Sequence, residues 1–242
     1  MSFQRNITRR KFLMASVVAL PMSQMILSGL SAAEATELAA PELNDYKPTF
    51  FNATEWLFIL AATDILIPAG GNGNAPGAIE TNVPIFLDQQ LDNEAFGQEI
   101  YMQGPFHTDL PKTKGYQIPF TPQKLYQYGI KLTNQWCLDK FAKPFAELTM
   151  AQQQDVLTKL QNSDIDFSPY GEEQMKASHF FSQLLDDTKH GYLADPMYGG
   201  NKGMKAWIAI GFPGARASFT EWVKQHNVPY PLGPVSIKGE RA

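Results

Sequence analysis

The amino-acid sequence predicts a mostly α-helical protein, a single irregular helical domain with long Pro/Gly-rich loops and an extended C-terminal tail. Three observations lead to this prediction. Several segments carry apolar residues at helical spacing and begin at capping residues. The clean polar–apolar alternation of half-buried strands is hard to find. The 17 Pro and 18 Gly among 242 residues indicate substantial loops between the helices.

The first helix is predicted over residues 52–67. Asn52 is a good N-cap, and Glu55 three residues later completes a capping box. Apolar residues then recur at i, i+3/4 and i+7, and Pro68 ends the pattern. The glycines at 70–73 follow a helix rather than a strand and have neither the dinucleotide-binding spacing nor a P-loop lysine, so they predict a loop.

A second helix is predicted from Pro84 to Gly104, followed by a long irregular segment. Thr121 and Pro122 provide the cap and the first-turn proline of the next helix, which extends to Phe141. A capping box at Thr149–Gln152 predicts the helix after it.

The last third of the chain alternates between helices and breaks. A helix is predicted over 171–190 with Gly191 as its terminator. A Pro/Gly loop, a short apolar helix, a Gly-Phe-Pro-Gly break and a final helix follow, and the segment 228–242 has three prolines and no helical period. We see no internal repeat and expect one domain, residues 36–242.

The N-terminal segment has the composition of an export signal. Residues 1–33 contain four basic residues and no acidic one, and the apolar stretch 12–22 is shorter than the roughly 20 residues that cross a bilayer. Small residues then offer cleavage after Ala33 or Ala35. The twin arginines Arg9 and Arg10, with Phe12 and Leu13, match the twin-arginine signal class, which is read by a receptor. We therefore predict a signal peptide over 1–35, and because this route carries folded proteins and suits those that take up a cofactor in the cytoplasm, we expect a cofactor somewhere in the exported assembly.

Composition excludes several function classes. Without residues 1–35 the chain keeps 16 of its 20 Lys and Arg and 23 of its 24 Asp and Glu, a net charge of −7, which disfavours nucleic acid as a partner. No later segment is apolar enough to span a membrane, so we expect membrane association only through a partner. The single cysteine, Cys137, can form neither an internal disulfide nor a haem, iron–sulfur or zinc site, and we expect it to be buried.

The titratable residues give no clear catalytic centre, metal site or cofactor site. Two of the four histidines, His179 and His190, can share a helix face but lie over ~15 Å apart, too far for one metal ion. The adjacent Asp186–Asp187 pair diverges on a helix, and Asp164-x-Asp166 lies in a turn-like segment where Asp closes local hydrogen bonds.

Aromatic and glycine residues are concentrated between Tyr192 and Gly214. Such segments either pack on their own core or form a docking surface, since aromatic residues and Met are favoured at interface cores. The proline-rich tail suits the same purpose because an extended arm has little entropy to lose. The candidate docking residues are Asp195, Pro196, Tyr198, Gly199, Gly200, Asn201, Trp207, Phe212, Pro213 and Gly214.

Four segments carry a resemblance to a known family: DILIPAGG, GYQIPF, LADPMYGGNKGMKAW and IGFPGAR. In this order, behind a twin-arginine signal, the chain resembles the gluconate 2-dehydrogenase subunit 3 family over about residues 50–235. One departure is Gly203, which stands where an acidic residue is expected after Asn-Lys.

The resemblance implies a complex of three subunits in the periplasm, at the inner membrane. A large subunit holds FAD and oxidises the substrate, a multihaem cytochrome c subunit passes electrons to quinone, and the small subunit has no cofactor of its own. We further expect the small subunit to dock the folded flavoprotein and to bring it to the twin-arginine translocase. Three alternatives stay open: a related complex acting on another sugar or ketogluconate, an export chaperone that later dissociates, and an independent periplasmic enzyme.

Overall fold

The computed structural model describes residues 41–70, 75–93, 104–107, 110–114, 117–228 and 230–242. Within these residues the regular structure is helical, with no β-strand, and the predicted mostly α-helical domain is confirmed. Two isolated bridges join Val235 to Gly214 and to Arg241. The α-helices are α4 (Ala53–Leu66), α5 (Val83–Leu91), α6 (Pro122–Phe141), α7 (Met150–Asn162), α8 (Ala177–Leu193) and α9 (Lys205–Ile210).

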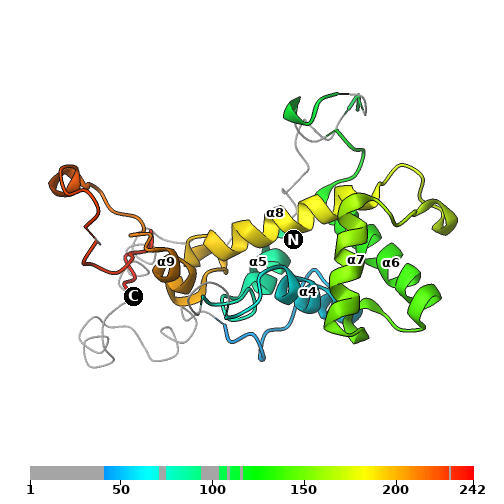
Figure 1. The fold of residues 1–242 in the computed structure, drawn as a ribbon, viewed down its shortest axis with the longest axis horizontal. Coiled ribbons are helices and arrows are strands. Elements are labelled where there is room, and N and C mark those ends of the chain that lie inside the picture. Colours follow the sequence, from blue (N-terminus) through cyan, green and yellow to red (C-terminus); the bar gives the residue numbers. More distant parts are fainter. Residues whose placement is uncertain (1–40, 71–74, 94–103, 108–109, 115–116, 229) are drawn as a thin grey trace, which may run out of the picture.

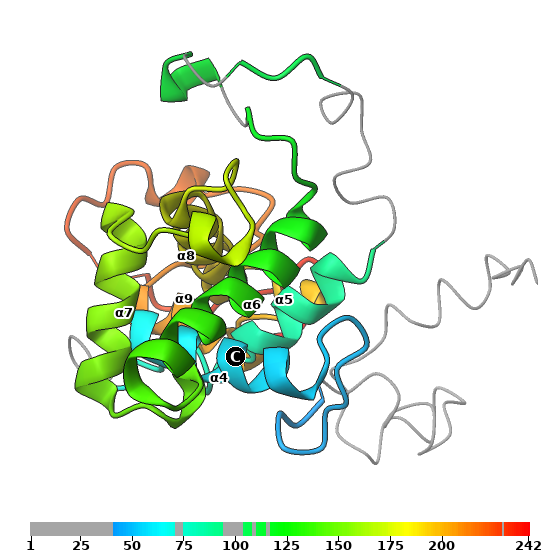
Figure 2. The same ribbon diagram turned by 90° about the vertical axis from the view of Figure 1, so that its right-hand side faces the viewer.

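Helix α8 connects the two ends of the molecule. Its first part packs against α6 and α7 at one end, and its last part reaches α9 and the C-terminal tail at the other (Figure 1). Helices α4 and α5 lie beside α8 between these ends, and α4 also contacts α6 and α7. Figure 2 views the molecule along this length, from the end formed by α6 and α7.

The core is built around aromatic rings contributed by α4, α6, α8 and the 3₁₀ turn Phe145–Glu147. The Phe58 ring centroid lies 4.6 Å from that of Phe145 and 5.9 Å from that of Phe180, and Tyr126 meets Phe180 edge-on at 5.8 Å. All four side chains are fully buried. Gly129 allows this approach of α6 to α8, because a Cβ atom there would lie 2.3 Å from Cγ of Phe180.

The helix starts predicted from local signals are confirmed. Asn52 accepts hydrogen bonds from the amides of Thr54 and Glu55, and the Glu55 carboxylate accepts one from the Asn52 amide. Thr121 caps α6, and Thr149 forms the capping box of α7 with Gln152. Each of these signals acts within three residues, which is why the sequence alone reveals them.

Helix α5 differs from its prediction. It begins next to Pro84 as expected, but it ends at Leu91 instead of extending to Gly104. Asp92 and Asn93 follow, and their short polar side chains favour helix ends because they compete for backbone hydrogen bonds. The rest of the predicted helix, residues 94–103, lies outside the described residues, as do residues 71–74 of the glycine-rich loop and the whole leader with Arg9, Arg10, Phe12 and Leu13.

Helix α8 was predicted with both ends misplaced. It begins at Ala177, six residues later than expected, and it continues through Gly191 to Leu193. Gly191 is therefore not a terminator. Its role is steric, since a Cβ atom there would lie 2.6 Å from Cδ1 of Phe86 on α5, and glycine allows the two helices to pack closely.

The final predicted helix does not form as an α-helix. Between Ala215 and Asn227 the described chain contains a single 3₁₀ turn, Thr220–Trp222. The backbone amide of Ala215 bonds the Val235 carbonyl instead of a helical partner, and the Arg216 guanidinium bonds the Gly233 carbonyl and lies over the Tyr230 ring. Contacts with the tail thus replace the helical hydrogen bonds of this segment.

Candidate partner-docking site

The candidate site begins in the loop between α8 and α9, residues 195–204. Asp195 is buried, and its Oδ1 accepts a 3.1 Å hydrogen bond from the amide of Met197 at the start of a 3₁₀ turn. Its Oδ2 accepts a 2.6 Å bond from the amide of Ile237 in the tail. One carboxylate therefore shapes the loop and attaches the tail to it.

Asn201 holds the other side of this loop. It is fully buried in a left-handed conformation with φ at 45°, its Nδ2 donates to the Ala194 carbonyl, and its Oδ1 accepts from the Ala206 amide. Gly200 allows the loop to approach α8, since a Cβ atom there would lie 2.1 Å from the Gly191 carbonyl oxygen. These contacts fix the start of α9 relative to the end of α8.

Trp207 anchors α9. The ring is 6% exposed, and its Nε1 donates a 2.8 Å hydrogen bond to the Leu193 carbonyl at the end of α8. Phe212, just beyond α9, packs edge-on against the Trp207 ring with 5.0 Å between centroids. Gly211 ends α9 with φ at 69°, and the chain then runs to Gly214, where Val235 packs too closely to admit a side chain.

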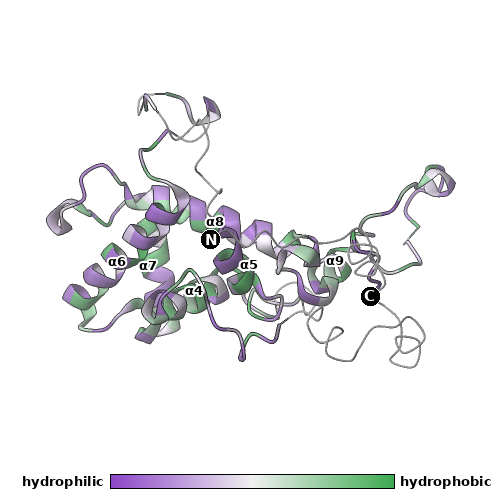
Figure 3. Ribbon diagram, turned by 180° about the vertical axis from the view of Figure 1, so that it is seen from behind, coloured by the Kyte–Doolittle hydropathy of each residue, from purple (hydrophilic) through white to green (hydrophobic). Residues whose placement is uncertain are grey.

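Six large apolar side chains between residues 193 and 212 remain exposed at this end of the molecule, which Figure 3 shows opposite α6 and α7. Their exposed fractions lie between 39% and 61%. We call them the α9 surface: Leu193, Met197, Tyr198, Ile208, Ile210 and Phe212.

A shallow groove adjoins the α9 surface. Leu193 and Tyr198 form part of its wall together with Phe86 of α5, and Lys189 and His190 add basic groups at its rim. Apolar side chains left open beside a polar rim are typical of protein–protein contact sites.

The ten candidate residues from the sequence divide into two groups. Tyr198 and Phe212 are exposed and belong to the α9 surface, whereas the remaining eight are buried or partly buried, and several hold the loop in shape. The sequence reasoning missed the other four members, Leu193, Met197, Ile208 and Ile210. The segment AWIAI carried a usable signal for two of them, because a short helix in which five consecutive residues are apolar cannot bury every one of them.

A comparison with protein families gives a match to gluconate 2-dehydrogenase subunit 3 over residues 53–214. This range covers most of the chain, from the first residue of α4 through the last residue of the candidate site. The chain belongs to the gluconate 2-dehydrogenase subunit 3 family. Its partners are therefore other dehydrogenase subunits. Comparison with curated proteins and with solved structures finds no match.

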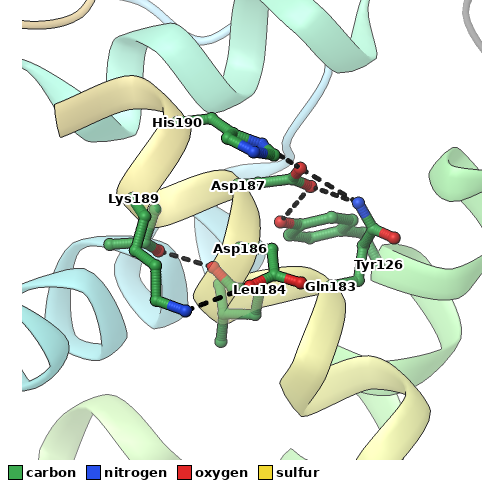
Figure 4. A network of polar contacts seen from close by, with 8 residues as sticks. Tyr126, Gln183, Leu184, Asp186, Asp187, Lys189 and His190 are labelled. Atoms are coloured by element: carbon green, nitrogen blue, oxygen red, sulfur yellow. Dashed lines mark hydrogen bonds and ion pairs between the residues drawn. The ribbon is translucent and has the colours of Figure 1, made fainter. Parts of the chain in front are cut away.

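A partly buried polar network of this subunit 3 resembles a catalytic arrangement and is shown in Figure 4. Asp187 Oδ2 accepts a 2.9 Å bond from the Tyr126 hydroxyl, both carboxylate oxygens accept from Gln183, and His190 Nδ1 lies 3.8 Å from Oδ1. Burial raises the pKa of Asp187 above its ordinary value. Tyr126 is fully buried in the core, so this carboxylate serves to fix α6 against α8.

The acidic pair Asp186–Asp187 diverges, as the sequence predicted. Asp186 pairs with Lys189 at the surface while Asp187 points inward. Asp166 closes a local turn through the Ser168 amide and hydroxyl, also as predicted. His179 accepts a bond from the Lys176 amide at the start of α8, a capping role.

Metal-ligand groups and membrane-spanning helices were also sought in the described residues of this subunit 3. Within the described parts of the chain, His, Cys, Asp and Glu side chains form no group of three or more that could hold a metal ion. The helices described here also include none with both the length and the apolar character needed to cross a bilayer.

Proposed function

We propose that this chain is the non-catalytic small, or gamma, subunit of an FAD-dependent gluconate 2-dehydrogenase complex. The large subunit takes hydride from D-gluconate onto FAD and releases 2-keto-D-gluconate, and a multihaem cytochrome c subunit passes the electrons to quinone. The observation that carries this proposal is the family match over residues 53–214.

The docking role is assigned to the α9 surface. In support, six large apolar side chains are exposed around a framework fixed by Asp195, Asn201 and Trp207. A rigid framework lowers the entropy lost when two proteins associate. The occupant we assign to this surface is the folded flavoprotein.

The leader, residues 1–35, has the second role. Its twin arginines Arg9 and Arg10 address a folded cargo to the twin-arginine translocase, a route that suits a flavoprotein which takes up its FAD in the cytoplasm. The small subunit thus brings the flavoprotein to the periplasm, where the complex is held at the inner membrane through the cytochrome subunit.

The docking role is tested by purifying tagged small subunit from cells that also make the large subunit. Tyr198→Ala and Ile210→Ala should lower the recovery of flavoprotein about tenfold each, the effect of one well-packed interface side chain. The control is Leu57→Ala, which removes an equally exposed apolar side chain from α4. Equal recovery from all three variants would overturn the assignment of the α9 surface.

The export role is tested by replacing both arginines, Arg9→Lys with Arg10→Lys, and measuring FAD in the periplasm and the cytoplasm. We expect the flavoprotein to stay in the cytoplasm. Its arrival in the periplasm would contradict the escort role. Absence of the small subunit from the purified periplasmic complex would favour a transient chaperone, and bound flavin or turnover by the isolated small chain would favour an independent enzyme. Assays with gluconate, 2-ketogluconate and other sugars identify the substrate.

A further inference from the structure

The segment immediately before α4 is held by one carboxylate of α5. Asp88 is fully buried, and its Oδ2 accepts hydrogen bonds from the Tyr46 hydroxyl at 2.7 Å and from the Thr49 amide and hydroxyl at 2.8 and 3.1 Å. Its Oδ1 accepts from the amides of Phe50 and Phe51 at 3.1 and 3.0 Å. Both oxygens are therefore occupied by donors from a single six-residue stretch.

This arrangement depends on the folded domain. The five donors are neutral, and hydrogen bonds that a carboxylate accepts are stronger than those between neutral groups. Three of the donors are consecutive backbone amides. Because all three donate to the same carboxylate, the backbone of this stretch is held in one conformation. Tyr46 also packs against Trp56 of α4, with 5.6 Å between ring centroids.

The beginning of the same segment is fixed beside the docking loop. Asn82 Nδ2 donates a 2.8 Å bond to the Pro41 carbonyl, and Lys202 Nζ bonds the Glu42 carboxylate at 2.6 Å. Lys202 belongs to the loop 195–204, and its backbone amide bonds the Thr81 carbonyl. Pro41, where the described segment begins, thus lies beside this loop.

We propose that residues 41–51 form a clasp that ties the base of the leader to the folded domain, with Asp88 closing the clasp and Asn82 and Lys202 fixing its outer end. The clasp protects the segment that follows the leader, at Glu42, from proteolysis while the domain is folded, and it fixes residues 41 and 42 beside the docking loop. The part that concerns the leader rests on the proposed export function.

The clasp is tested first by hydrogen exchange of the purified full chain. Asp88→Asn keeps the size of the side chain but replaces one carboxylate oxygen with an NH₂ group, which cannot accept the hydrogen bonds that this oxygen accepted. We expect the amides of Thr49, Phe50 and Phe51 to exchange roughly tenfold faster or more, while amides of α8 keep the wild-type rate. The control is Asp92→Asn, an exposed position at the end of the same helix. Unchanged exchange at residues 49–51 overturns the clasp.

If Asp88→Asn also accelerates exchange in α8, the whole domain has been destabilised, and Tyr46→Phe is then the variant that tests the clasp. It removes a single donor and leaves the buried carboxylate in place. Faster exchange confined to residues 49–51 then supports the clasp, and wild-type rates overturn it.

The link to the leader is tested by limited digestion with a glutamyl endopeptidase that cuts after Glu42. Asp88→Asn should raise the cutting rate about tenfold over Asp92→Asn, because a protease requires a locally unfolded stretch. An unchanged cutting rate overturns the protective role. None of these measurements needs the large subunit, so failure of wild-type protein to recover flavoprotein would contradict the proposed function and leave the clasp standing.

Discussion

The carboxylate of Asp195 and the backbone amide of Ile237 form a 2.6 Å hydrogen bond across 42 residues of sequence. This bond joins the loop that shapes the candidate docking site to the C-terminal tail. The Ala215 amide donates to the Val235 carbonyl and the Val235 amide donates to the Pro213 carbonyl, so the tail is folded back against the site.

Replacing Asp195 with Ala should release the tail from the loop. Two backbone amides, those of Met197 and Ile237, would lose their acceptor, and we expect the free energy of unfolding to fall by about 1–3 kcal/mol. Hydrogen exchange should accelerate at both amides. Asp195→Asn is the matched control, since it keeps one acceptor oxygen and should preserve the bond to Met197. Exchange at Ile237 that is equally slow in wild type and Asp195→Ala would contradict the tie.

The Asp195 bond joins residues remote in sequence, and contacts of this kind are what the sequence could not predict. Caps such as Asn52 with Glu55 were correct because they depend on neighbours within three residues. Gly191 was interpreted as a helix terminator by the same local logic, but a contact with Phe86, remote in sequence, determines its role. Asp88 gave no local signal, since its partners lie 37 or more residues away, and the bond from Tyr126 to Asp187 spans 61 residues.

The candidate site shows the same difference between local signals, which the sequence reveals, and remote contacts, which it does not. The density of aromatic residues and glycines located the region between residues 192 and 214, because composition is visible in the sequence. Which side chains face outward depends on α8 and the tail, so Trp207 turned out buried and Ile210 exposed. The leader prediction concerns residues 1–35 and stays a prediction.

Gly129→Ala should destabilise the protein although alanine is the better helix former. A Cβ atom at this position would lie 2.3 Å from the Phe180 ring, and overpacking of this kind costs about 1–3 kcal/mol. Helix propensity alone would change stability by about 1 kcal/mol in the opposite direction. Urea unfolding measures the result, with the exposed Lys131→Ala on the same helix as control. A gain in stability would show that α6 and α8 are not in this close contact.

Cys137 should be unreactive in the folded protein. It is fully buried, and burial raises the pKa of its thiol to about 12, so the reactive thiolate is scarce at neutral pH. Alkylation by iodoacetamide should therefore proceed at the rate of unfolding. A Gln135→Cys, Cys137→Ser variant provides the comparison, because position 135 is exposed two residues earlier on α6. Equal alkylation rates for the two folded proteins would contradict the burial of Cys137.

Asp187 should make the stability of the protein depend on pH in the acidic range. Burial raises its pKa in the folded state above the ordinary value of 3.8, and this effect exceeds the opposing contributions of Gln183, Tyr126 and His190. Between the two pKa values the folded state binds the proton more tightly than the unfolded state does. The stabilisation from this group is therefore complete below 3.8 and is lost as the pH rises through the folded-state pKa.

The measurement is the free energy of unfolding in urea across this pH range for wild type and Asp187→Asn. Because Asn does not titrate, the difference between wild type and variant should decline as the pH rises and then become constant above the folded-state pKa. Asp186→Asn is the control for the loss of a carboxylate from this helix, since Asp186 lies at the surface beside Lys189. A wild-type curve that instead gains stability over Asp187→Asn with rising pH would mean that the hydrogen bonds from Tyr126 and Gln183 outweigh burial.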